Sequence, residues 1–127
     1  MRTLLVVMAV VEAGAGLALL AAPSFVAVLL LGSSLEGGVS LIVARICGSG
    51  LLSLGIACLL GRGDAGAPAA GLITAMLVYN VITTALLAYA GFGLGLTGLL
   101  LWPAIVIHAA LAIWCVVRLR SVPPVRA

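Results

Sequence analysis

Charge is scarce in this 127-residue chain. Lysine is absent, and charged residues make up only 7% of the sequence: six arginines together with Glu12, Glu36 and Asp64. Soluble domains carry about 25% charged residues, so this composition excludes an ordinary soluble fold. The net charge of +3 is too small and too dispersed for a nucleic-acid-binding surface. We therefore expect no nucleic-acid partner.

Recognisable catalytic and metal-binding motifs are also missing. The HExxH, Walker and nucleophile-elbow patterns do not occur, and no GxGxxG lies in a strand-turn-helix context. Cys47, Cys58 and Cys115 lie within apolar runs without a CxxC pair, so we expect packing residues rather than metal ligands. The sequence predicts no metal and no cofactor. An enzyme that uses the standard chemistry of soluble proteins is disfavoured.

Long hydrophobic runs, in contrast, are abundant. Hydrophobic residues make up 65% of the chain, and the mean hydropathy is +1.45. A transmembrane helix needs about 20 apolar residues. Four such runs, at 3–22, 39–61, 69–91 and 97–117, predict an all-α integral membrane bundle of four transmembrane helices, forming a single domain over residues 1–127.

Two features near the N-terminus need separate interpretation. Glu12 interrupts the first apolar run and Pro23 directly follows Ala22, so we interpret this run as a retained helix rather than a cleaved signal peptide. The next apolar piece, residues 25–31, is too short to span a bilayer. We expect a short interfacial helix there, between the first and second spans, with Ser24 as a candidate cap.

The arginines predict the orientation in the membrane. Positive residues near helix ends are retained on the cytoplasmic side, and in a four-span arrangement five arginines fall on one side. Both termini are therefore expected to be cytoplasmic, in a bacterial-type inner membrane. These arginines are Arg2, Arg62, Arg118, Arg120 and Arg126.

The remaining arginine belongs to a set of polar residues inside the spans. Glu12, Arg45, Asn80 and His108 each occupy one of the four apolar runs. At 1.5 Å per residue, Glu12 lies about 14 Å from the cytoplasmic start of its helix and Arg45 about 9 Å from the outer start of the next. The charge of Arg45 costs about 3 kcal/mol in the membrane. We therefore expect Arg45 to pair with Glu12, and the four residues to meet in the interior.

Two interpretations of this polar cluster remain open. Small residues near Glu12 and Arg45 permit close helix contact, and Asn80 shares its helix face with Thr83. The cluster either holds the helices in register, or lines a cavity that binds the polar head of a ligand or relays protons. Tyr79 could join the site or simply fill the core.

The layout resembles small bacterial four-helix membrane proteins of the DoxX-like type. The resemblance rests on the glycine-rich first helix ending in AAP, the FVAVLLLG segment, and RICGSGLLSLG in the second span. It implies an accessory or quinone-associated membrane subunit, and it transfers no catalytic residue.

The leading functional expectation is a non-enzymatic accessory subunit or a binder of a lipid-like or quinone-like molecule through the polar cluster. The alternatives are a small transporter or proton-coupled permease component that uses Glu12, Arg45 and His108, and a membrane enzyme acting on a lipid-soluble substrate. Expected partners are membrane lipids, together with a lipid-soluble small molecule or a larger membrane complex. The sequence leaves the oligomeric state open.

Overall fold

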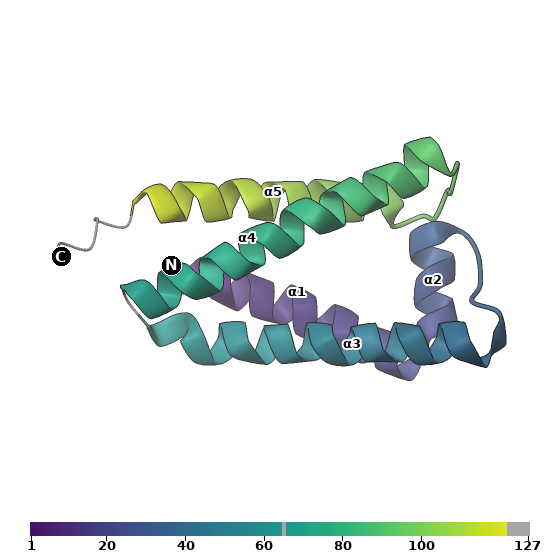
Figure 1. The fold of residues 1–127 in the computed structure, drawn as a ribbon, viewed down its shortest axis with the longest axis horizontal. Coiled ribbons are helices and arrows are strands. Elements are labelled where there is room, and N and C mark those ends of the chain that lie inside the picture. The colour runs from purple at the N-terminus through teal and green to yellow at the C-terminus, as the bar shows by residue number, and fades with distance from the viewer. Residues whose placement is uncertain (65, 122–127) are drawn as a thin grey trace.

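The computed structural model describes residues 1–64 and 66–121 and is helical throughout its regular elements. Figure 1 shows long helices running back and forth, with one short helix lying across them at one end. The long helices are α1 (Arg2–Ala21), α3 (Gly37–Leu60), α4 (Ala67–Ala88) and α5 (Leu101–Arg120), and the short helix is α2 (Pro23–Leu31). The 3-10 turn η1 (Gly61–Gly63) follows α3, and the π-helical turn η2 (Tyr89–Gly93) follows α4.

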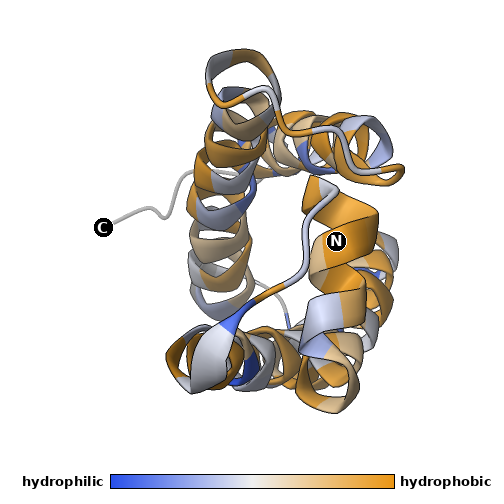
Figure 2. Cartoon of the chain, turned by 90° about the vertical axis from the view of Figure 1, so that its right-hand side faces the viewer, coloured by the Kyte–Doolittle hydropathy of each residue, from blue (hydrophilic) through white to orange (hydrophobic). Residues whose placement is uncertain are grey.

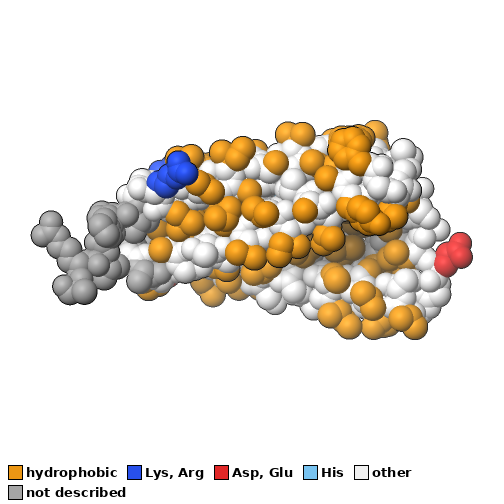
Figure 3. Space-filling model, turned by 45° about the horizontal axis from the view of Figure 1, so that its top comes forward, with side chains coloured by type: hydrophobic (Ala, Val, Ile, Leu, Met, Phe, Trp, Pro, Cys, Tyr) orange, Lys and Arg blue, Asp and Glu red, His pale blue; other side chains and the backbone are white. Residues whose placement is uncertain are grey.

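Four helices are long and apolar enough to cross a membrane, as the sequence predicts. They cover Arg2–Ala21, Gly37–Gly63, Pro68–Gly93 and Leu101–Arg120. Large apolar side chains such as Val10, Ile46, Val81 and Ile113 point outward from them. Hydrophobic residues are spread over all the long helices rather than confined to one stripe (Figure 2). On the face in Figure 3, basic side chains lie at one end and an acidic side chain at the other, with an apolar belt between them. This pattern is typical of a multi-pass membrane protein.

Glycine allows α1 and α3 to pack closely in antiparallel fashion. A Cβ added to Gly16 would lie 2.5 Å from the Leu52 nitrogen, and one added to Gly55 would lie 2.7 Å from the Ala13 nitrogen. Gly48 faces Gly16 in the same interface. Only residues without a side chain permit such an approach, which provides van der Waals contact between helices in lipid.

The second helix pair, α4 and α5, packs along its own length, whereas contacts between the two pairs are few. The pairs meet mainly in the half of the bundle where α1 begins and α5 ends. There a core of large apolar residues is fully buried, including Leu4, Met8, Ile73 and Met76. Cys58 and Cys115 belong to this core, as expected for packing residues, but Cys47 is exposed. This half of the bundle is therefore filled by side chains.

Helix α2 bridges the two pairs at the opposite end. The Leu100 N–H donates a hydrogen bond to the Leu29 carbonyl at 2.8 Å, which ties α2 to the start of α5. A Cβ on Gly98 would overlap the Leu30 carbonyl. The chain from Thr97 to Leu100 thus packs on α2, and α5 begins at Leu101 rather than at the expected residue 97. The predicted short helix is confirmed.

The start of α2 differs from expectation in one detail. Ala22 is the N-cap, Pro23 is the first helical residue, and no side chain caps the helix. Proline is favoured at this position because its missing N–H would have no helical partner. Ser24 instead donates a hydrogen bond from Oγ to the Leu35 carbonyl at 3.3 Å, which ties α2 to the loop before α3. The expectation that Ser24 caps α2 is therefore wrong.

Candidate functional site

A cavity of about 620 Å³ lies between the two helix pairs, in the half of the bundle nearest α2. All five α-helices contribute to its wall. Gly14 and Ala18 come from α1, Leu51 from α3, and Phe25 and Leu29 from α2, and residues from α4 and α5 complete the wall. Cavities of 300–1,000 Å³ with mostly apolar walls and a few polar groups are typical of small-molecule sites.

The polar groups of this cavity come from α4 and α5. Tyr79, Thr83 and His108 are its polar lining residues, whereas the remaining lining residues carry aliphatic, aromatic or no side chains. His108 and Tyr79 pack edge to face, with their ring centroids 5.7 Å apart and an angle of 79° between the ring planes. They lie at about the middle of their helices. The hollow half of the bundle therefore has a polar base near mid-depth.

Asn80 holds His108 in place from behind. The Asn80 side chain is fully buried, and its Nδ2 donates to the Met76 carbonyl at 2.7 Å. Its Oδ1 lies 2.8 Å from His108 Nδ1, which joins α4 to α5. A buried amide in lipid needs such partners because no water is present to replace them. The sequence-based expectation that these two residues meet agrees with this geometry.

Glu12 lies beside this group. Only 1% of its surface is exposed, and Oε1 is buried without a hydrogen-bond partner among the described residues. The Tyr79 side chain lies near the Glu12 carboxyl group. Glu12 itself is not a lining residue. It therefore supports the site from behind Tyr79.

Arg45 is not part of this cluster, and the expected ion pair with Glu12 is wrong. The Arg45 side chain is exposed, and its Nε donates to the Leu20 carbonyl at 3.2 Å. The reason is the register of the antiparallel pair. Glu12 lies level with Gly55, because Gly55 contacts the neighbouring Ala13, and ten residues along α3 separate Arg45 from that level by about 15 Å.

The bond to Leu20 explains why an arginine occurs in this span. Helix α1 ends at Ala21, directly before Pro23. The last carbonyls of a helix lack intrahelical partners, and cations near that end are stabilised by the helix dipole. No basic residue occurs in the last turn of α1. Arg45, from the neighbouring helix, supplies the missing donor and positive charge.

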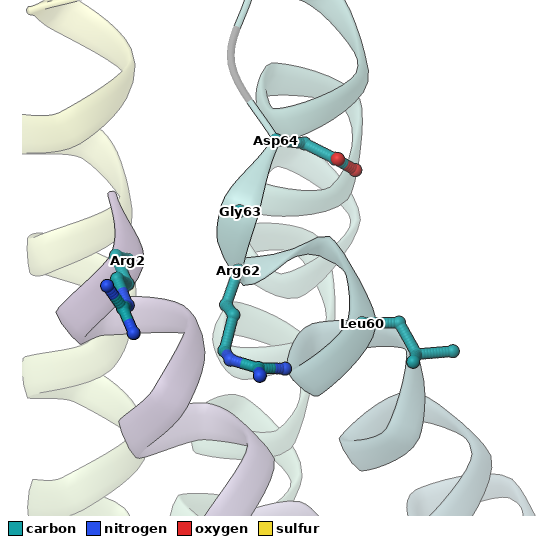
Figure 4. Close-up of a pocket in the computed structure, with 5 residues that line it drawn as sticks. All are labelled: Arg2, Leu60, Arg62, Gly63 and Asp64. Atoms are coloured by element: carbon teal, nitrogen blue, oxygen red, sulfur yellow. The ribbon is translucent and has the colours of Figure 1, made fainter.

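A second hollow lies at the opposite end of the bundle, where α1 begins and α5 ends. It has a volume of about 590 Å³ and is lined by Arg2, Leu60, Arg62, Gly63 and Asp64. Figure 4 shows Arg2 at the start of α1 and Arg62 on η1 flanking an open gap, while the Asp64 carboxylate points away from both. Arg118 and Arg120 lie in the last turn of α5 at the same end. Arg126 lies outside the described residues.

Most of the cavity wall was not predicted from the sequence. Glycine and alanine at positions 14, 15 and 18 line it, although small residues in α1 equally suggest helix contact. A Cβ at Gly14 would meet nothing within 4 Å, whereas one at Gly16 would overlap α3. The usable signal was the i, i+4 spacing of Gly14 and Ala18, on a face different from that of Gly16.

Comparisons with protein-family models, curated proteins and solved structures found no match.

Proposed function

We propose that this protein is a non-enzymatic membrane protein that binds a lipid-soluble molecule in the cavity beneath α2. The observation that carries the proposal is the cavity itself, which combines an apolar wall with Tyr79, Thr83 and His108 at its base. An amphiphile places its tail against the apolar wall and its polar head on this base. Binding sites of this kind use a few placed polar groups for orientation.

The architecture supports binding rather than passage across the membrane. The half of the bundle beyond the polar base contains the packed core of Leu4, Leu5, Met8, Ile73 and Met76. A transporter needs access from two sides, and such a core closes one of them. We therefore favour the binding function over the transporter alternative. The proposal includes a role as an accessory subunit of a larger membrane complex that binds such a molecule.

The proposal also gives the orientation of the protein in the membrane. The arginine-bearing end faces the cytoplasm, since positive residues are retained there, and Arg2 and Arg62 lie among anionic headgroups. The cavity and α2 then belong to the outer half of a bacterial-type inner membrane. Both termini are cytoplasmic in this arrangement.

A cavity-filling substitution tests the binding function. Gly14 lines the cavity and an added Cβ meets no atom within 4 Å, so Gly14→Leu projects a side chain into the space without a backbone clash. The matched control is Gly50→Leu on α3, where an added Cβ also meets nothing and which does not line the cavity. Both changes replace a helical glycine by leucine.

Native mass spectrometry of the purified proteins provides the measurement. We expect the unsubstituted protein and Gly50→Leu to retain a lipophilic molecule of the same mass, or to take up an added alkylphenol. We expect Gly14→Leu to lose at least about nine-tenths of this occupancy. The leucine side chain fills part of the space that the ligand needs, and overpacking of this kind is costly. Equal occupancy in all three proteins contradicts binding in this cavity.

A further inference from the structure

The hydrogen bonds behind the cavity determine which hydrogen-bonding role His108 presents to a ligand. Asn80 donates from Nδ2 to the Met76 carbonyl at 2.7 Å, and this bond directs its amide oxygen toward α5. That oxygen, Oδ1, lies 2.8 Å from His108 Nδ1. An amide oxygen only accepts hydrogen bonds, so the proton of the imidazole belongs on Nδ1.

The other ring nitrogen then becomes the group available to the cavity. In a neutral imidazole one nitrogen donates and the other accepts, which makes Nε2 an acceptor. Among the described residues the only hydrogen bond of the His108 side chain passes through Nδ1, while the ring lines the cavity. An acceptor in a mostly apolar space favours a ligand that brings its own donor.

We infer that the cavity selects lipid-soluble molecules that carry a hydroxyl group, which donates its hydrogen bond to His108 Nε2. The inference rests on the proposed binding function and narrows its ligand class to phenols, quinols and long-chain alcohols. Molecules of the same size that carry only carbonyl or ether oxygens are bound less tightly. The Tyr79 ring, edge to face with His108, lies beside the bound head group.

Asn80 is a positioning residue in this arrangement. It does not line the cavity, and it acts by fixing the ring orientation and the tautomer of His108 through the bond to Nδ1. A similar role is common for groups that hold the second nitrogen of a functional histidine. Loss of the Asn80 oxygen frees the ring to exchange its proton between the two nitrogens.

The test compares two probes of matched shape, 4-heptylphenol and its methyl ether 4-heptylanisole, on the full-length protein in mild detergent. We expect the phenol to bind about five- to tenfold more tightly, which is the ratio that one hydrogen bond contributes. Equal or tighter binding of the ether overturns the hydroxyl preference while leaving the binding function intact. Binding of neither probe overturns both proposals.

Nitrogen NMR gives an independent readout that needs no substitution. The chain contains one histidine, so ¹⁵N-labelled histidine reports on His108 alone. We expect the signals of a ring protonated at Nδ1, and a shift of the Nε2 signal when 4-heptylphenol is added. A ring protonated at Nε2 in the ligand-free protein overturns the inference.

Two variants complete the test. His108→Phe keeps an aromatic ring but has no acceptor, and we expect the phenol-to-ether affinity ratio to fall to about one while both probes still bind. Asn80→Leu removes the amide that positions His108, and we expect the proton to move partly to Nε2 and the ratio to fall by at least half. An unchanged ratio in His108→Phe contradicts the assigned contact. If either variant fails to fold, the wild-type probe comparison and NMR signal decide the matter.

Discussion

Replacing glycine by alanine is expected to have opposite effects on stability at two positions of α1. Gly14 and Gly16 lie two residues apart in the same helix. A Cβ at Gly14 meets nothing within 4 Å, whereas a Cβ at Gly16 lies 2.5 Å from the Leu52 nitrogen and 2.6 Å from the Gly48 oxygen. Both neighbours are backbone atoms of α3, so neither can move without moving the helix.

The geometry sets the expected magnitudes. Ordinary contact begins near 3.4 Å, so Gly16→Ala forces α1 and α3 apart by about 1 Å, and a gap of 0.5–1 Å forfeits a quarter to a half of each van der Waals contact. We expect Gly16→Ala to lower the free energy of unfolding by about 1–3 kcal/mol. Gly14→Ala should raise it by up to about 1 kcal/mol, because alanine is the better helix former.

The assay is reversible unfolding in mixed micelles, followed by circular dichroism, for the unsubstituted protein and both variants. The difference between the two variants is expected to be about 1–4 kcal/mol. Because both replace glycine by alanine in one helix, their change in intrinsic helix propensity cancels in this comparison. Variants of equal stability would refute the close α1–α3 contact at Gly16.

Three further outcomes are expected. Asn80→Ala should destabilise the protein by about 1–2 kcal/mol in the same unfolding assay, because it removes the bond to His108. Unchanged stability would contradict the role of this bond. Arg45→Leu should leave the free energy of unfolding within about 1 kcal/mol of the unsubstituted value, because the lost hydrogen bond is offset by the removed cost of a charge in the membrane. It should speed hydrogen exchange at the end of α1, where the Leu20 carbonyl loses its donor. Unchanged exchange would argue against this capping role of Arg45. Gly98→Ala should weaken the packing of α2 on the segment before α5, because the new Cβ overlaps the α2 backbone. The Leu100 amide, which donates to the Leu29 carbonyl, should then exchange its hydrogen about tenfold faster. Unchanged exchange would contradict this packing.

The polar residues show when depth along a helix predicts which side chains from different helices meet. Asn80 and His108 occur at about the middle of two helices joined by a short connection, and the structure joins them by a 2.8 Å contact. Glu12 and Arg45 do not meet, although their depths along the first two spans are similar if the ends of these spans are level. Glycine contacts instead set a register that places Arg45 beside Leu20.

The cavity was beyond prediction for a related reason. Its wall combines one side of every long helix with the underside of α2, and hydrophobic residues surround these helices on all sides. In a membrane helix, apolar character does not distinguish a core-facing side from a lipid-facing side, because lipid is as apolar as leucine. The rotation of each helix about its axis is therefore not encoded in the hydrophobic pattern.

Composition and the length of the apolar runs were enough to predict an all-helical chain with four candidate membrane spans. Hydrocarbon tolerates only backbones whose polar groups are hydrogen-bonded internally. A helix of about 20 residues meets this requirement within one segment. Composition and run length were also enough to place the short helix after the first span. The partner of Arg45, the Asn80–His108 bond and the hollow beneath α2 depend instead on helix register and rotation. Those are decided by contacts between distant segments, such as the fit of α1 against the glycines of α3.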